Sequence, residues 1–498
     1  MNEFPVYEEI HVISDIHMGG KPGFQILRET GRLANFIHWV ARQRPDDRVA
    51  LVLNGDVIDT LAEDINGYVA VDDALATVDR IMKDANFAPV WAALKAFVHT
   101  DKRSLVVVIG NHDIEIAFPT VQRLILDRLG DGDAAARARV EFSASGAGYT
   151  CVVGNARMFC THGNEVDPWN FNRYEDLSRV ARRINSGRTL APEEWTPNAG
   201  TRMVKDVMNE VKKRYAWIDL LKPENSAAIG TLLAIDPSQL GKINKLPAIV
   251  GAKVVGSLEV DQRLSADGLQ RPAAPAAPPS LESLLGPNVL DGMQTAGARP
   301  GRSGDDMLLA LEQQRSGTAR AVNTLGDAPL GVGQLVWDRL TGWLTNVSRD
   351  EALRRALQDW LRGDKTFAID DKDETFNEIT AKLGPAIDFT VTGHTHLERA
   401  IDMRAGRYYF NSGTWIRLMR FSEDLLGNAQ SFKSVYEVLM DGRMAAIDAA
   451  TVSGQPLVLD QTSSVSVSLE NGKTVGRLNH VTGDGSLTPS EIKKFERP

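Results

Sequence analysis

The chain has few cysteines, no long apolar run and no large excess of charge. Only two of its 498 residues are cysteines, Cys151 and Cys160, which excludes a disulfide framework. The formal net charge of −9 argues against a protein that binds polyanions over its whole surface. No apolar run is long enough for a transmembrane helix, and the first nine residues do not resemble a signal peptide. We therefore expect a cytoplasmic protein with reduced thiols.

Histidine is also scarce, yet five of the nine histidines lie in five short turns. In chain order, these turns are Asp15-Ile16-His17, Gly55-Asp56-Val57-Ile58-Asp59, Gly110-Asn111-His112-Asp113, His162-Gly163-Asn164 and Gly393-His394-Thr395-His396. Each turn follows a short apolar run rich in β-branched residues. Hard metal ligands placed just past strand ends are how an open α/β sheet builds a metal site. The sequence thus predicts a site that binds two divalent cations and hydrolyses a phosphate ester.

The first 165 residues alternate between strand and helix patterns. Strands are expected at Ile10–Ser14, Val49–Leu53 and Ser104–Ile109, with helical patterns inside Phe24–Arg42 and Asp72–His99. Such an alternation predicts a parallel sheet covered by helices. A hairpin at Tyr149–Val153 and Ala156–Thr161 then leads to His162, and its turn places Cys151 opposite Met158.

The second half of the chain mixes helical, low-complexity and strand-like stretches. Helical patterns follow His162 and return after Asp305, on either side of the Pro/Ala/Gly-rich stretch Arg271–Arg302. That composition is typical of a flexible linker or disordered loop. Later strands are expected at Phe389–Thr392, Ala400–Met403, Arg407–Asn411, Val435–Met440 and Met444–Ala449. The tail from Gln455 is polar, with β-like alternation at Ser464–Leu469 and then a weakly ordered end.

Several carboxylates and imidazoles in the turns have the spacing of metal ligands. Asp15 and His17 can offer one oxygen and one nitrogen to the same ion, although alone they are equally typical of a helix N-cap and a loop histidine. Asp56 can bridge two cations with its two oxygens. His394 and His396 share a face of an extended segment, so each can reach a different ion of a pair.

The Gly110-Asn111-His112-Asp113 turn is the most diagnostic. Asn111 offers a neutral carbonyl ligand, and the adjacent His112 can donate a proton to a leaving oxygen. Asp59 is either a cap for the next helix or a carboxylate that orients a histidine. Alone, His162 is more typical of an ordinary loop histidine; the five turns together favour the metal site.

Together the five turns resemble the calcineurin-like metallophosphoesterases, whose pattern is Asp-x-His, Gly-Asp-x-x-Asp, Gly-Asn-His-Asp/Glu, His and Gly-His-x-His. The resemblance covers Ile10 to about Ala449, apart from a long insertion. It implies an α/β fold, a four-layer α-β-β-α sandwich with a large, mainly helical insertion. It also implies two divalent metal ions, with Mn expected and Fe, Zn, Ni or Mg as alternatives.

The same resemblance assigns roles to the matching positions. One ion would be held by Asp15, His17, Asp56 and His396. The other would be held by Asp56, Asn111, His162 and His394. His112 would be the proton donor, steered by Asp59, and a metal-bound hydroxide would attack phosphorus in line.

Two departures narrow the subclass. Protein Ser/Thr phosphatases of this superfamily have an arginine where this chain has Thr60, and the lipid A pathway pyrophosphatases have an arginine where it has His112. The bacterial phosphodiesterase branch fits best, so a phosphodiesterase is expected. One alternative is a DNA or RNA nuclease of the same superfamily, with nucleic acid as partner. The other is a non-catalytic, metal-stabilised scaffold that binds a protein partner through its helical insertion.

We divide the chain into a catalytic core in two parts with an interrupted insertion between them. The expected segments are the first part of the core (1–168), a helical insertion (169–265), a flexible linker (266–305), a second helical part (306–385), the second part of the core (386–450) and a C-terminal extension (451–498). Residues 170–265 contain 15 lysines and arginines and 11 acidic residues, in an otherwise acidic chain. Candidate contacts to an anionic phosphate-ester substrate are Arg173, Arg179, Arg182 and Arg183.

Overall fold

The apolar runs of the first half form the centre of a seven-stranded sheet in the computed structural model, which describes residues 3–191, 194–221, 231, 234–235, 347–361, 368–452, 454–482 and 488–497. The strand order is β17-β16-β15-β2-β3-β4-β5, with β2 to β5 parallel and β15 to β17 antiparallel. The strands span Glu9–Ile13 (β2), Val49–Asn54 (β3), Arg103–Val108 (β4), Val140–Ser143 (β5), Ser463–Glu470 (β15), Lys473–His480 (β16) and Ser490–Arg497 (β17).

A second sheet of six strands has the order β1-β6-β7-β8-β10-β9. Its strands span Val6–Tyr7 (β1), Tyr149–Val153 (β6), Ala156–Cys160 (β7), Phe389–Thr392 (β8), Glu398–Arg404 (β9) and Arg407–Ser412 (β10). β8 pairs in parallel with both β7 and β10. β7 and β8 are therefore neighbours although more than two hundred residues separate them in the chain. The predicted hairpin of β6 and β7 is confirmed, with Cys151 opposite Met158 and both thiols free and buried.

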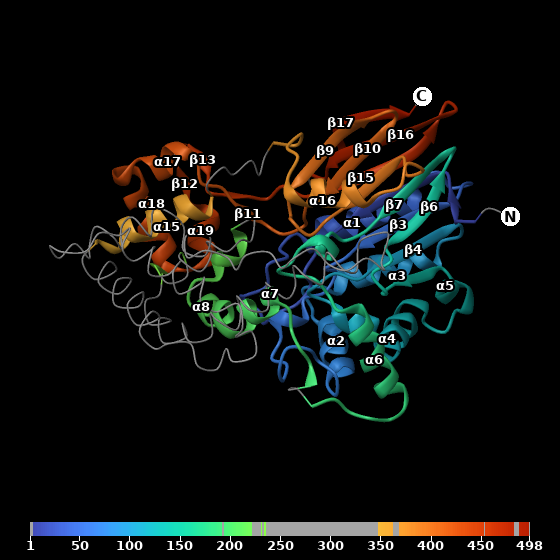
Figure 1. Ribbon diagram of the computed structural model, residues 1–498, viewed down its shortest axis with the longest axis horizontal. Helices are drawn as coiled ribbons and strands as arrows, with labels where there is room; N and C mark the ends of the chain where they lie inside the picture. Colours follow the sequence, from blue (N-terminus) through green and yellow to red (C-terminus); the bar gives the residue numbers. More distant parts are fainter. Residues whose placement is uncertain are drawn as a thin grey trace, which may run out of the picture.

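The two sheets pack face to face through the apolar side chains of their facing surfaces. In β3, Ala50 and Val52 face the second sheet, while Leu51 and Leu53 face helices. Those helices are α1 (Thr30–Arg42), α2 (Ala74–Lys83), α3 (Ala88–His99), α4 (Pro119–Gly130), α5 (Ala134–Ala138) and α6 (Tyr174–Asn185). On the outer face of the six-stranded sheet, α16 (Glu374–Lys382) packs Phe376 against Tyr409. The four-layer α-β-β-α sandwich is therefore confirmed (Figure 1).

A separate group of helices, which we call the helical body, lies on the other side of the molecule from the sheets (Figure 1). It consists of α7 (Ala199–Met203), the π-helical turn η5 (Val204–Met208), α8 (Asn209–Lys212), the 3₁₀ turn η6 (Ala216–Leu220), α15 (Arg349–Trp360), α17 (Glu423–Gly427), α18 (Ala429–Asp441) and α19 (Met444–Ala449), with β11 (Leu418–Met419) and β14 (Val458–Leu459). A short ladder joins β12 (Thr451–Val452) to β13 (Gln455–Pro456).

Two sequence-based predictions for the C-terminal region are wrong. Val435–Met440 and Met444–Ala449 are helical, not strands: α18 starts at a capping Asn428 and ends at Gly442, which has a positive φ. The tail is not weakly ordered at its end, because 490–497 form β17. The expected β-like alternation at Ser464–Leu469 is confirmed, since Ser463–Glu470 form β15 and pair with β2. Of the residues assigned to the second part of the core, those from Leu418 on thus pack in the helical body, and residues assigned to an extension complete the main sheet.

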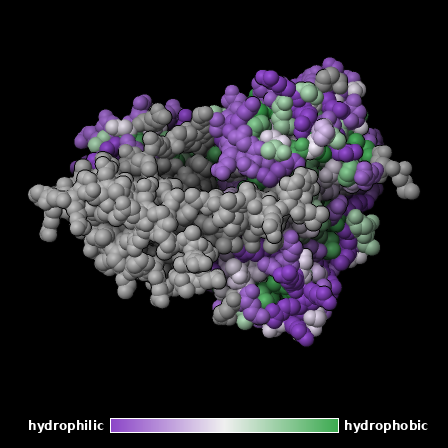
Figure 2. All heavy atoms as spheres, in the orientation of Figure 1, coloured by the Kyte–Doolittle hydropathy of each residue, from purple (hydrophilic) through white to green (hydrophobic). Residues whose placement is uncertain are grey.

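The predicted flexible linker, 266–305, lies outside the described residues. Among the described helices, none combines the length and apolar character needed to cross a bilayer. On the face shown in Figure 2, the described surface is mainly hydrophilic, with hydrophobic residues in small separate groups.

Candidate metal centre

The predicted ligand turns lie at one end of the sandwich, because their strands run parallel. Asp15, Asp56 and Asn111 follow β2, β3 and β4, which are neighbours in one sheet. His162 and His394 follow β7 and β8, which are neighbours in the other sheet. Two hydrogen bonds tie these ends together: Asn54 Nδ2 donates to Thr161 O at 2.9 Å, and the His162 ring donates to Asn54 O at 2.7 Å. The carboxyl ends of five strands thereby converge on one site.

Five of the predicted ligands adopt a backbone conformation that side chains usually avoid. Asp15, His17, Asp56, His394 and His396 all have φ between 51° and 69°, and they make up five of the eleven non-glycine residues with positive φ in the described chain. Such residues are uncommon, and they gather at sites where function demands a particular side-chain direction. The unusual backbone conformation of these turns directs the five side chains into the site, at a cost in backbone strain.

Close packing of backbone and ligand explains one glycine of the motifs. A Cβ added at Gly110 would overlap the carboxylate of Asp56. That carboxylate also accepts the backbone N–H of His112, from the same turn as Gly110, at 2.9 Å. Glycine is needed here because the β4 turn must approach the ligand without a side chain of its own.

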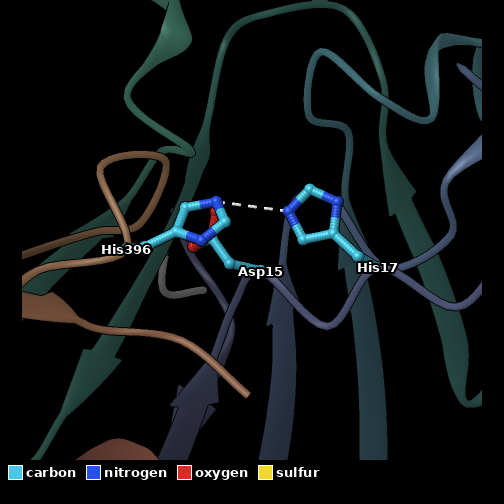
Figure 3. A group of neighbouring side chains, drawn as sticks. All are labelled: Asp15, His17 and His396. Carbon is cyan, nitrogen blue, oxygen red and sulfur yellow. Dashed lines mark hydrogen bonds and ion pairs between the residues drawn. The ribbon is translucent and has the colours of Figure 1, made fainter. Parts of the chain in front are cut away.

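The first group of potential ligands is Asp15, His17 and His396, whose ligand atoms lie within 4.8 Å of one another (Figure 3). The Nε2 atoms of His17 and His396 are 3.2 Å apart, and His396 Nε2 is also 3.2 Å from Asp15 Oδ1. Each ring is held from behind: His17 Nδ1 lies 3.4 Å from Asp59 Oδ2, and His396 Nδ1 lies 3.5 Å from the hydroxyl of Thr414. The nitrogens that remain face one another and Asp15.

The second group is Asp15, Asp56 and His162. His162 Nε2 lies 3.2 Å from Asp56 Oδ2, and its Nδ1 is the atom that donates to Asn54 O. Asn111 Oδ1 is a buried acceptor without a hydrogen-bond partner, and Asp15 Oδ1 and His162 Nε2 are buried atoms that make no hydrogen bond but lie 3.2 Å from His396 Nε2 and Asp56 Oδ2, respectively. A buried acceptor without a donor is costly, so these atoms fit cations better than they fit a purely structural role.

A third group, His17, Asp59 and His112, lies beside the first two. His112 Nδ1 is 3.1 Å from Asp59 Oδ1, and its ring meets that of His17 edge-on at 4.8 Å between centroids. Asp59 also accepts the backbone N–H of Ala62, so it is both a cap and a partner of two histidines. Asp59 therefore has both roles expected from the sequence, as a cap for the following helical turn and as a carboxylate that contacts histidines.

The charge balance of the site is set by carboxylates that sit against imidazoles. Burial opposes ionisation of Asp56, but His162 and His112 nevertheless hold the pKa of its carboxyl well below the usual range. Burial by itself would lower the pKa of His162, whereas Asp56 and Asp15 raise it to about 10. For Asp15, burial dominates and raises the pKa, assisted by Asp56. The buried carboxylates thus depend on protonated imidazoles to balance their negative charge. A bound cation would supply that positive charge instead.

His394 is the one predicted histidine ligand outside all three groups among the described residues. Its Nε2 makes a hydrogen bond of 2.8 Å to Asp167 Oδ2, and its ring centroid is 5.3 Å from that of His162. Asp167 also accepts the backbone N–H of Trp169 and the side chain of Asn170, so it is firmly placed. Burial opposes ionisation of Asp167, yet contact with His394 lowers its pKa.

Sequence reasoning missed two acidic residues of this region. Asp167 stands five residues after His162, and its only sequence signal is that closeness. Asp113 was read only as the end of a motif, but it accepts the backbone N–H groups of Val57 and Gly110 at 2.8 and 2.7 Å. It therefore clamps the β3 turn to the β4 turn.

Three of the four arginines predicted to contact substrate have partners elsewhere. Arg173 donates to Thr196 O. Arg179 pairs with Asp176, and Arg183 pairs with Glu194. None of the four, Arg182 included, contributes to the hydrogen bonds or ion pairs described above for the metal centre.

Comparisons with known proteins agree with this geometry. A family model described as calcineurin-like phosphoesterase matches residues 9–217. No curated protein sequence matches. A crystal structure of a dimetal phosphatase from Danio rerio is similar over 98% of both chains, with 9% identity and a TM-score of 0.29, a value too low to establish a likeness in detail. Residues 9–217 thus match the calcineurin-like phosphoesterase family, and the three His/Asp groups in the same part of the fold support a metal-dependent phosphoester hydrolase.

Proposed function

We propose that this protein is a phosphodiesterase with a dinuclear metal site. In this proposal Asp15, His17, Asp56 and His396 would hold one cation, and Asp56 would also serve the second. Asn111, His162 and His394 complete the second set. The observation that carries the assignment is the convergence of Asp15 Oδ1, Asn111 Oδ1 and His162 Nε2, buried atoms that make no hydrogen bond, among carboxylates and imidazoles. When bound, divalent cations supply the nucleophile and neutralise charge on the phosphoryl oxygens.

The way each imidazole is anchored supports these ligand roles. His162 and His396 are each held through Nδ1, to Asn54 O and the hydroxyl of Thr414, which leaves Nε2 for a cation. His394 is held through Nε2 by Asp167, which leaves Nδ1. Ligating histidines almost always donate their other ring N–H to a carbonyl, carboxylate or water. We therefore assign Asp167 as the carboxylate that positions His394.

His112 is proposed as the general acid. Its Nδ1 is engaged by Asp59 at 3.1 Å, so the proton on Nε2 is the one available to a leaving oxygen. The side chain of His112 is 12% exposed, whereas those of His17 and His162 are 2% and 0% exposed. Of these three rings His112 is thus the one a substrate can reach most easily.

A diester is favoured over a monoester by the charge around the site. A monoester brings two negative charges and is usually met by added cationic side chains, whereas a diester brings one. Thr60, directly after Asp59, is fully buried and donates to the carbonyl of His112, so this position offers no cation to substrate. Contacts from Arg173, Arg179, Arg182 and Arg183, manganese as the native ion and a cytoplasmic location stay predictions.

The proposal is tested by stripping the protein of metal, reconstituting it with Mn²⁺ and comparing bis-p-nitrophenyl phosphate with p-nitrophenyl phosphate. We expect two ions per chain and a higher kcat/KM on the diester. Single-stranded DNA in the same panel tests the nuclease alternative, whose binding must weaken steeply with salt. A preference for the monoester would overturn the diester assignment, and cleavage of DNA far above the small diester would favour the nuclease.

A further inference from the structure

A short stretch of the helical body is docked on the loop that follows Asp59. We call residues 202–209 the docking segment and residues 61–68 the docked loop. Asn209 Nδ2 donates to the carbonyl of Leu61 at 3.2 Å. Lys205 Nζ lies 3.4 Å from the carbonyls of both Glu63 and Ile65. Three backbone carbonyls of one loop are therefore held by two side chains four residues apart on the same helical face.

The contact continues at both ends. Tyr68 OH donates to Asp206 Oδ2 at 3.0 Å, and the guanidinium of Arg202 lies over the Tyr68 ring at 5.5 Å. Leu61 is buried in the core of the helical body, although the chain around it belongs to the catalytic sandwich. The segment also contains the π-helical turn η5, an irregularity that is frequent at functional positions.

The residues directly before the docked loop contact His112, the proposed general acid. Directly before the loop, Thr60 binds the carbonyl of His112 twice, through its backbone N–H at 3.1 Å and its hydroxyl at 2.8 Å. Asp59 binds the His112 ring. Within the loop, the Glu63 side chain accepts the N–H of Gly20 at 2.7 Å, beside the turn that carries His17. A shift of this loop must therefore move groups that hold His112.

We propose that the docking segment positions His112 for proton transfer, with Lys205 and Asn209 as the positioning residues. The inference rests on the proposed role of His112 as general acid. It assigns part of the insertion to bond cleavage, whereas an insertion concerned with substrate choice alone would leave the chemical step unchanged. Directional hydrogen bonds to backbone carbonyls fix a loop closely, and a misplacement of about 1 Å at a reacting group can cost about 10²-fold in rate.

The test uses the full-length, Mn²⁺-loaded protein and a series of methyl aryl phosphates whose phenols differ in leaving-group pKa. The variant is Lys205→Ala with Asn209→Ala, and its matched control is Lys213→Ala, an exposed lysine at the end of the same helical stretch. For the poorest leaving group we expect kcat to fall about tenfold, with KM and metal content unchanged. For p-nitrophenolate, which needs no proton, the fall should be less than about twofold. Lys205→Arg, in place of Lys205→Ala, should restore most of the loss.

A double-mutant cycle separates positioning from general destabilisation. Once His112 is replaced by alanine, adding Lys205→Ala and Asn209→Ala should have no further effect on kcat, since the group being positioned is gone. Additive losses, or equal losses for all leaving groups, would overturn the inference. If His112→Ala alone slows good and poor leaving groups equally, the general-acid role fails and the inference fails with it. If His112→Ala shows the leaving-group dependence but the docking variant matches Lys213→Ala, only the inference fails.

Discussion

Replacing Glu115 with glutamine should remove one specific pH dependence of stability. Glu115 lies in the 3₁₀ turn η2 (Ile114–Ala117) and is fully buried. One oxygen accepts the N–H of Ala70 at 2.7 Å, and the other meets the hydroxyl of Thr60 at 2.6 Å. The Thr60 hydroxyl has one proton and also donates to His112 O, so a protonated Glu115 that donates to Thr60 satisfies all three groups.

The magnitude follows from the pKa of this carboxyl. Burial raises the pKa of Glu115 from 4.5 to about 7, against the opposing bonds from Thr60 and Ala70. Because the folded-state pKa is raised, its stabilising effect is complete below pH 4.5 and is lost as the pH rises through 7. A shift of this size corresponds to about 3 kcal/mol of unfolding free energy. Glutamine fits the same bonds, with its amide oxygen toward Ala70 and its NH₂ toward Thr60.

The assay is urea unfolding of the wild-type protein and Glu115→Gln at pH 5 and pH 9. The free energy of unfolding of the variant, relative to wild type, should rise by about 3 kcal/mol between the two values. Glu378→Gln, a half-exposed change in α16, controls for the loss of an acid as such. A difference between Glu115→Gln and wild type that stays constant with pH would refute the argument that a buried proton holds these two turns together.

Three further predictions concern the metal centre itself. Asp56→Asn should lose one or both ions and nearly all activity, because one carboxylate serves two cations; elemental analysis that finds two ions with full turnover would contradict this. His112→Ala should keep the metals and slow hydrolysis by about 10²–10⁴-fold, as measured by kcat on esters with poor leaving groups, and an equal loss on all esters would remove it as the acid. Asp167→Ala should weaken metal affinity by about 10–100-fold in a chelator titration, with partial recovery in Asp167→Asn; unchanged affinity would leave Asp167 with a local structural role only.

The sandwich and most of the proposed ligand set could be predicted from local patterns in the sequence. Each ligand stands within a few residues of the end of a short strand, as Asp56 does after the apolar strand Val49–Asn54. Parallel strands bring their carboxyl ends together whatever the length of the connections. The meeting of β7 with β8 across the insertion therefore followed from local patterns and from the resemblance that they carry.

Local patterns were less decisive where a short apolar segment fits either the helical or the strand periodicity and packing selects between them. Val435–Met440 reads as a strand, yet Val435 and Leu439 lie on the buried side of α18 with Phe432. The signals that identify this helix are its ends, Asn428 and Gly442, rather than its interior. An apolar run this short is compatible with either structure until a neighbouring surface is present to bury it.

Contacts between segments far apart in the chain could not be predicted from the sequence and are seen only in the folded structure. Asp167 meets His394 from 227 positions away, and Asn209 reaches Leu61 across 148. Neither contact can be predicted from the spacing of the two residues in the sequence, because the relative placement of two loops depends on how whole layers of the fold pack. The C-terminal strands complete the main sheet for the same reason: β2 leaves an edge that any suitable strand can fill, and the fold brings Ser463–Glu470 to that edge.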